Sequence, residues 1–84
     1  MPNEVDEILN ERQKTHGDFK THALITQSLK KAAVEHAISQ LTHSQAEALE
    51  MILHKIGRIL NGNPNHKDHW DDIAGYATLV SREL

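Results

Sequence analysis

The chain contains no cysteine, two prolines, and only one Trp, one Tyr and one Phe among its 84 residues. Without cysteine, no disulfide can staple the fold, and the composition is typical of a reducing compartment. No apolar run approaches the roughly 18 residues of a membrane helix, and the N-terminal segment lacks a signal-peptide core. We therefore expect a cytoplasmic protein with no membrane partner.

Strand patterns are also missing, because no stretch alternates polar residues with β-branched or aromatic ones. Helical periodicity dominates instead, and the sequence predicts one all-α domain over residues 1–84, a small bundle of about four helices. The predicted helices cover about residues 3–15, 18–40, 44–61 and 68–84. Asn3 is the expected cap of the first, and capping boxes that begin at Thr42 and Ser44 precede the third.

Size and charge narrow the possible partners. A chain of 84 residues with 38% apolar residues buries only a lean core, and since disulfides are absent, we expect a homo-oligomer. With 9 basic and 12 acidic residues the net charge is −3, which argues against a surface for a nucleic acid duplex. Seven histidines make the net charge sensitive to pH near 6.

The third predicted helix is the most regular. Its aliphatic residues fall within one arc: Leu49, Ile52, Leu53, Ile56, Ile59 and Leu60. The opposite face is polar, with Lys55 at its edge: Glu47, Glu50, His54 and Arg58. This polar face is either solvated and crossed by i,i+4 pairs, or it is a site where carboxylates hold a divalent cation and the cations hold a phosphate.

The start of the fourth predicted helix gathers acids, histidines and Trp70 within residues 66–72. Asp68 as N-cap and Asp71 in the first turn would complement the helix dipole. Asp72 has no such explanation, and it lies one turn from Tyr76. The histidines here have no cysteine beside them and no second pair, so we expect no structural metal.

Two glycines lie inside predicted helices, Gly57 in the third and Gly75 in the fourth. A glycine in mid-helix costs about 1 kcal/mol relative to alanine, so a compensating close approach is expected there. Tight packing between the two helices is one interpretation, and approach by a ligand is the other.

Three segments together resemble a family of small helical proteins from tailed bacteriophages. They are Arg12-x-x-x-His16-Gly17-Asp18, Lys55-x-x-Arg58-Ile59 and Asp68-x-Trp70-x-Asp72-Ile73-Ala74-Gly75-Tyr76. The resemblance spans nearly the whole chain. It implies a phage protein in the cytoplasm of an infected bacterium, but it implies no particular activity.

A more distant resemblance is to the MazG-like nucleoside triphosphate pyrophosphohydrolases, which are all-α and depend on magnesium. Their acidic motifs correspond here to Glu47-x-x-Glu50 and Asp68-x-x-Asp71. The match is incomplete, since Ala46 stands where that family has its first glutamate. If the hydrolase interpretation holds, these four acids would bind Mg²⁺, and otherwise we expect no cofactor.

Three functions remain open. The first is binding, without catalysis, of a nucleotide-like ligand such as a signal of bacterial immunity, which the phage protein would sequester. The residues expected to bind it are His16, Asp18, His54, Lys55, Arg58, Trp70, Asp72 and Tyr76. The cations would neutralise phosphate, the rings would stack on a base, and the aspartates would accept hydrogen bonds. The alternatives are magnesium-dependent hydrolysis and inhibition of a host protein.

Overall fold

The computed structural model describes residues 4–36 and 38–84, and within these residues it is helical without any strand. Its elements are α1 (Glu4–His16), α2 (Phe19–Glu35), the short 3-10 helix η1 (Ile38–Gln40), α3 (His43–Asn61) and α4 (Lys67–Ser81). The all-α class and the small bundle are confirmed. None of the described helices is both long and apolar enough to cross a membrane.

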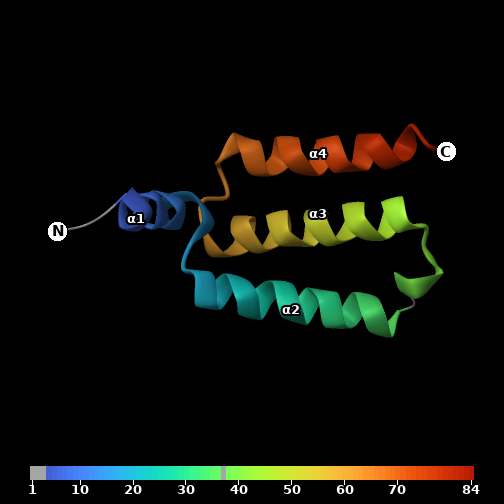
Figure 1. The fold of residues 1–84 in the computed structure, drawn as a ribbon, viewed down its shortest axis with the longest axis horizontal. Coiled ribbons are helices and arrows are strands. Elements are labelled where there is room, and N and C mark those ends of the chain that lie inside the picture. The colour runs from blue at the N-terminus through green and yellow to red at the C-terminus, as the bar shows by residue number, and fades with distance from the viewer. Residues whose placement is uncertain (1–3, 37) are drawn as a thin grey trace.

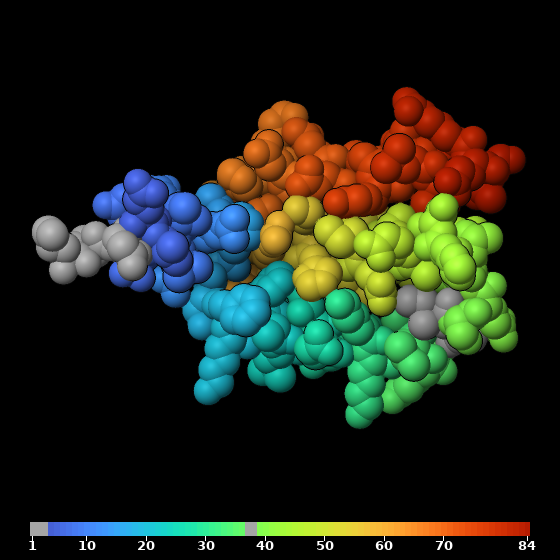
Figure 2. Space-filling model, viewed as in Figure 1, coloured from blue at the N-terminus to red at the C-terminus, as the bar shows by residue number. Residues whose placement is uncertain are grey.

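The three longer helices lie side by side in one layer, with α3 between α2 and α4 (Figure 1). The shorter α1 lies at one end of this layer and projects beyond it, as the space-filling view also shows (Figure 2). The molecule measures 49 × 26 × 22 Å, and its radius of gyration is 14.6 Å. A compact chain of this length would have a radius of about 12 Å, so the fold is flat and elongated.

Helix α2 begins where the sequence predicts, because Asp18 caps it. The Asp18 carboxylate accepts hydrogen bonds from the backbone N–H groups of Lys20 and Thr21, both at 3.2 Å. The helix ends at Glu35 rather than at the predicted Gln40. The chain must reverse there so that α3 can lie beside α2, and η1 forms part of this connection. The cap expected at Asn3 lies outside the described residues.

Helix α3 starts at one of its two predicted capping boxes. Thr42 Oγ1 accepts from the Gln45 N–H at 3.1 Å, and Gln45 Oε1 accepts from the Thr42 N–H at 3.0 Å. The second box does not form, because the Ser44 hydroxyl donates to Glu83 at 3.0 Å instead. Helix α4 has His66 as its N-cap, and Asp68 therefore lies in the first turn rather than at the cap.

The isolated chain buries very little apolar surface. Ala48 is the only residue with an apolar side chain that is buried among those described. Besides Gly57, the other buried residues are polar: His22, Thr26, Lys55 and His69. The accessible surface area is 6292 Å², whereas a folded monomer of 9.5 kDa is expected to expose about 5,000 Å². The layer is one helix thick, so its helices are covered only along their flanks.

The expected core of α4 is affected in the same way. The helical periodicity of residues 68–84 predicts that α4 buries Trp70, Ala74 and Ala77. Instead, Trp70 is 53% exposed, and its indole N–H donates to the Pro64 carbonyl at 2.7 Å. Ala74 and Ala77 are exposed as well. The prediction is wrong because, beyond the contact of His69 with α1, α4 packs along its length only against α3, which covers a narrow stripe of the helix.

The two mid-helix glycines differ in their surroundings. A Cβ on Gly57 would lie 2.7 Å from Cγ2 of Thr26 and 3.1 Å from the His22 ring, so this glycine lets α2 approach α3 closely. A Cβ on Gly75 would meet no atom within 4 Å. A close helix approach is therefore present at Gly57, but with α2, so the predicted packing of Gly57 against the fourth helix is wrong. The same prediction is wrong for Gly75 within this chain.

We predict that Gly57→Ala lowers the free energy of unfolding by about 1–3 kcal/mol, because the new methyl group would overpack the buried contact with Thr26. The matched change Gly75→Ala adds a methyl group in open space and removes a glycine from a helix, so it should raise stability by up to ~1 kcal/mol. Urea denaturation followed by circular dichroism measures both. Equal effects would contradict this account of α2–α3 packing.

Candidate functional site

Two loops from distant parts of the sequence are locked together beside the end of α3. The Thr15 carbonyl accepts hydrogen bonds from the Asn63 N–H and from His69 Nε2, both at 2.9 Å. Asn61 Nδ2 donates to the Asp18 carbonyl at 2.7 Å. Gly17 adopts the left-handed conformation, with φ of 77°, directly against Asn61. The turn between α1 and α2 is thereby held on the loop between α3 and α4.

Three histidines meet where these loops touch. The ring of His69 is almost fully buried, and its centroid lies 5.1 Å from that of His16 and 4.7 Å from that of His66. Because the Thr15 carbonyl can only accept, His69 must carry its proton on Nε2. The buried ring thus fixes the position of His16 at the end of α1.

A half-buried ion pair joins α3 and α4 next to this cluster. Lys55 Nζ lies 2.8 Å from Asp72 Oδ2, and the lysine side chain is only 10% exposed. The hydrogen bond from Lys55 holds the pKa of Asp72 below its usual value, and the charge of Arg58 acts in the same direction. The pair therefore sets the position of α4 along α3.

A cleft of about 870 Å³ opens between α1, α2 and α3. This volume falls within the range typical of small-molecule sites. Its polar and aromatic lining includes His16, Phe19, His22, His54 and Arg58. These residues come from the end of α1, the first turns of α2 and the last two turns of α3.

Three rings form a row along the cleft. Phe19 and His22 have centroids 6.5 Å apart, His22 and His54 have centroids 5.7 Å apart, and each pair is inclined by 29°. Phe19 is 80% exposed. The Nδ1 atom of His22 is buried and has no hydrogen-bond partner among the described residues. The row therefore offers an aromatic face to the cleft, while His22 Nδ1 is buried against Gly57 in the contact between α2 and α3.

The histidines of the cleft are held uncharged at neutral pH. Burial lowers the pKa of His16 from 6.5 to about 4, and the positive charges of Arg58 and Lys55 add to this effect. Burial is also the main cause of the lowered pKa of His22 and of His54, followed by nearby cations. Arg58 contributes to all three shifts. An anion in the cleft would counter these effects and favour protonation.

Arg58 is one of two arginines that line the cleft, the other being Arg12, and the carboxylate of Asp6 also belongs to the lining. The described residues form four ion pairs, and none of them includes Arg58. The residue is partly exposed on the cleft side of α3. An arginine that takes part in no ion pair among the described residues, beside three imidazoles of lowered pKa, provides donors for an anionic ligand.

The sequence matches, over residues 3–83, a family described as a domain of unknown function, DUF6378. The chain belongs to this family. No match was found among curated proteins or among solved structures. Membership in DUF6378 covers almost the whole chain but carries no assigned activity, so the phage and MazG-like resemblances stay predictions.

Within this DUF6378 chain, the eight residues expected to bind ligand fall into three groups. His16, His54 and Arg58 line the cleft together. Lys55 and Asp72 form the neighbouring ion pair. The others are placed differently: the Asp18 carboxylate is occupied in capping α2, and neither Trp70 nor Tyr76 lines the cleft.

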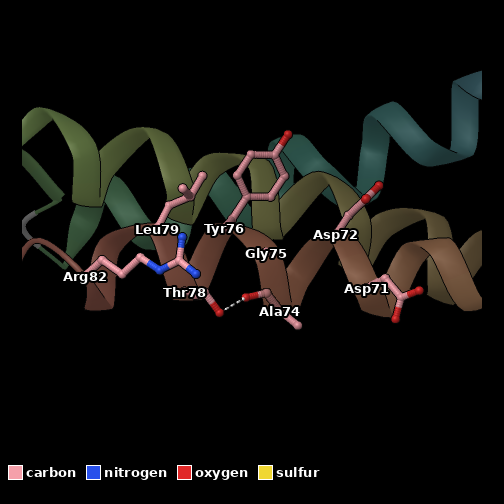
Figure 3. Close-up of a pocket in the computed structure, with 8 residues that line it drawn as sticks. All are labelled: Asp71, Asp72, Ala74, Gly75, Tyr76, Thr78, Leu79 and Arg82. Carbon is pink, nitrogen blue, oxygen red and sulfur yellow. Dashed lines mark hydrogen bonds between the residues drawn. The ribbon is translucent and has the colours of Figure 1, made fainter.

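Tyr76 and Asp72 lie on α4, where they project to the same side one turn apart (Figure 3). They border a second, shallower hollow of about 480 Å³ along that helix, together with Gly75, Leu79 and Arg82. All of its lining residues come from α4. A hollow on a single helix offers few converging groups, so the cleft is the stronger candidate.

The four acids of the hydrolase alternative are dispersed over α3 and α4. Asp71 is paired with Lys67 at 2.6 Å, and Asp68 lies 3.9 Å from His66. Glu47 is exposed on α3, and Glu50 is partly exposed. Within residues 4–36 and 38–84, no group of three or more metal-binding side chains converges.

Sequence reasoning missed three residues of the site. The helical spacing places Phe19 on the same face of its helix as Ala23 and Ala33 and gives it no role in the site, whereas it is exposed at the cleft. His22 and His69 received no role, although both are among the most buried side chains. The sequence contains one signal for His22. Gly57 predicts that another segment approaches its helix closely, and His22 and Thr26 are the residues of α2 that do so.

We predict that the free energy of unfolding falls as the pH drops from 6.5 toward 4. Below 6.5 the unfolded chain binds more protons at these histidines than the folded chain does, because their pKa values are lowered in the folded chain. Denaturant titrations across this range measure the slope. His16→Gln should flatten it, whereas His36→Gln, an exposed position at the end of α2, should not. A flat profile for the unsubstituted protein would contradict the prediction.

Proposed function

We propose that the cleft binds a nucleotide-like anion without catalysing a reaction on it. The observation that carries this proposal is Arg58, a cation with no ion-pair partner among the described residues, placed in a cleft that also presents aromatic rings. Cations and planar rings in one cleft match the two chemical halves of a nucleotide. The phosphate lies at Arg58 and His16, and the base lies against the row of Phe19, His22 and His54.

The uncharged histidines serve this role better than permanent cations would. In the free protein they avoid repelling Arg58, and they take up protons when a phosphate enters. Lys55 and Asp72 hold α4 in place rather than contacting the ligand, since the two neutralise each other.

The resemblance to phage proteins supplies the ligand class in this proposal. A small protein that binds a signalling nucleotide of the infected bacterium, such as a cyclic oligonucleotide or an ADP-ribose derivative, removes that signal by sequestration. The proposal includes a homo-oligomer in the bacterial cytoplasm. Its support is the large exposed surface of the single chain.

We predict that Arg58→Met weakens binding by about ten- to a hundredfold, because a charge-assisted hydrogen bond to phosphate is lost. Isothermal titration with ADP-ribose, a cyclic dinucleotide, ADP and inorganic pyrophosphate measures the affinity. Lys31→Met, at an exposed position of α2, makes the same change in net charge outside the cleft and should leave the affinity unchanged. An equal loss of affinity in both variants would mean that only the net charge of the protein matters, and it would contradict a direct contact of Arg58 with the phosphate.

The titration also separates binding from turnover. If none of the probes binds, the proposal fails. If a nucleoside triphosphate is cleaved in the presence of Mg²⁺, as followed by phosphorus NMR, the hydrolase alternative replaces it. Substitution of Glu50 and Asp71 would then abolish cleavage, whereas Arg58→Met would mainly raise KM.

We predict that affinity for the probe that binds increases as the pH falls from 7.5 to 6, with net proton uptake on binding. The lowered pKa values leave the cleft histidines neutral in the free protein, and the bound phosphate raises them. Titrations in two buffers of different ionisation enthalpy count the protons. Release of protons, or an affinity independent of pH, would show that the imidazoles do not contact the anion.

A further inference from the structure

The most regular apolar surface of the chain is left uncovered. The α3 apolar arc, defined by the six aliphatic residues named above, contains no buried side chain: Leu49 is 37% exposed, Leu60 is 66% exposed, and the other four are partly exposed. The buried residues of α3 are instead Ala48, Lys55 and Gly57. Within one chain, the positions of α3 that are buried are therefore not the ones that carry its large aliphatic side chains.

The direction of this arc follows from the contacts of α3. Lys55 marks the flank against α4, through its ion pair with Asp72, and Gly57 marks the flank against α2, through Thr26. At about 100° per residue these two flanks are about 200° apart around the helix. The helix thus has two remaining sides, which correspond to the two broad faces of the layer.

These two sides have opposite chemistry. The arc, centred on Ile56, occupies one of them, and His54 and Arg58 occupy the other, where α1 and the cleft lie. The cleft side is polar and is partly covered by α1. The arc side is aliphatic, and no element of the described chain fills it, because α3 has only α2 and α4 along its flanks.

The excess accessible surface area of the single chain is comparable to the area that a protein interface buries. The accessible surface of 6292 Å² exceeds the expectation for a folded monomer by about 1,200 Å². A standard interface removes about 800 Å² from each partner. Domains also require a second packed layer to bury the apolar face of the first. The excess can be removed by one interface on this face.

We infer that a second copy of this chain covers the α3 apolar arc, so that two layers pack arc against arc around a two-fold axis. Ala48 is the only residue with an apolar side chain that is buried among those described, so the folded chain needs a partner that covers the arc at all times. A second copy of the chain meets this requirement, because it is present wherever the first copy is made. The arc itself contains no charged residue, so identical surfaces meet without repulsion.

This arrangement places the two clefts on opposite outer faces of the dimer. The inference is independent of the proposed ligand, since the arc and the cleft lie on different sides of α3. If no ligand binds, the inference of a dimer is therefore unaffected. If the chain does not dimerise, the proposal for the cleft is unaffected.

The unsubstituted protein provides the first test. Sedimentation equilibrium and native mass spectrometry are expected to give twice the mass of the chain. The urea midpoint is expected to rise with protein concentration, because dissociation and unfolding are then coupled. A monomeric mass together with a urea midpoint that does not depend on protein concentration would overturn the inference. The arc would then be a surface for a different partner.

Two leucines of equal exposure locate the interface. Leu60 lies in the arc and is 66% exposed, whereas Leu24 lies on α2, on the side opposite His22 and Thr26, and is 68% exposed. Leu60→Lys should weaken association by at least about tenfold, while Leu24→Lys should leave it unchanged. Equal responses of the two variants place the interface elsewhere and overturn the arc-to-arc geometry. If Leu60→Lys does not fold, Leu49→Lys at the other end of the arc replaces it.

Discussion

The structure depends on the position of α3 between two neighbours in a layer that is one helix thick. The ion pair of Lys55 with Asp72 fixes one flank, and the close approach of α2 to Gly57 fixes the other. A helix held on both flanks has two free sides, and here these sides differ in chemistry. The cleft with Arg58 is the consequence on one side, and the uncovered aliphatic arc is the consequence on the other.

The second organising contact is the junction of the two loops at the end of α3. One carbonyl, that of Thr15, accepts from the backbone of the α3–α4 loop and from the buried ring of His69. This junction holds α1, which has few other contacts, against the layer. It also positions His16 at the mouth of the cleft. The cleft therefore depends on residues that are about fifty positions apart in sequence.

The sequence predicts the helices well because their signals are local. The Thr42 capping box involves only the next three residues and forms as predicted, and the predicted start of the second helix near Asp18 is also local, because Asp18 caps it. The burial pattern could not be predicted in this way. Apolar periodicity identifies the arc of α3 but not which neighbour covers it, and Trp70 is exposed because α4 packs along its length only against α3. The pairing of Lys55 with Asp72 is likewise a product of tertiary packing.

The single turn from His54 to Arg58 shows how much one stretch of helix does in this fold. Its five successive residues face the cleft, α4, the uncovered arc, α2 and the cleft again. A helix usually tolerates substitution on the side that faces solvent. No side of this turn faces solvent alone, because each position lies at the cleft, at a neighbouring helix or in the arc. In a complete substitution scan, these five positions should stand out as the least tolerant stretch of the protein, each accepting a different class of residue.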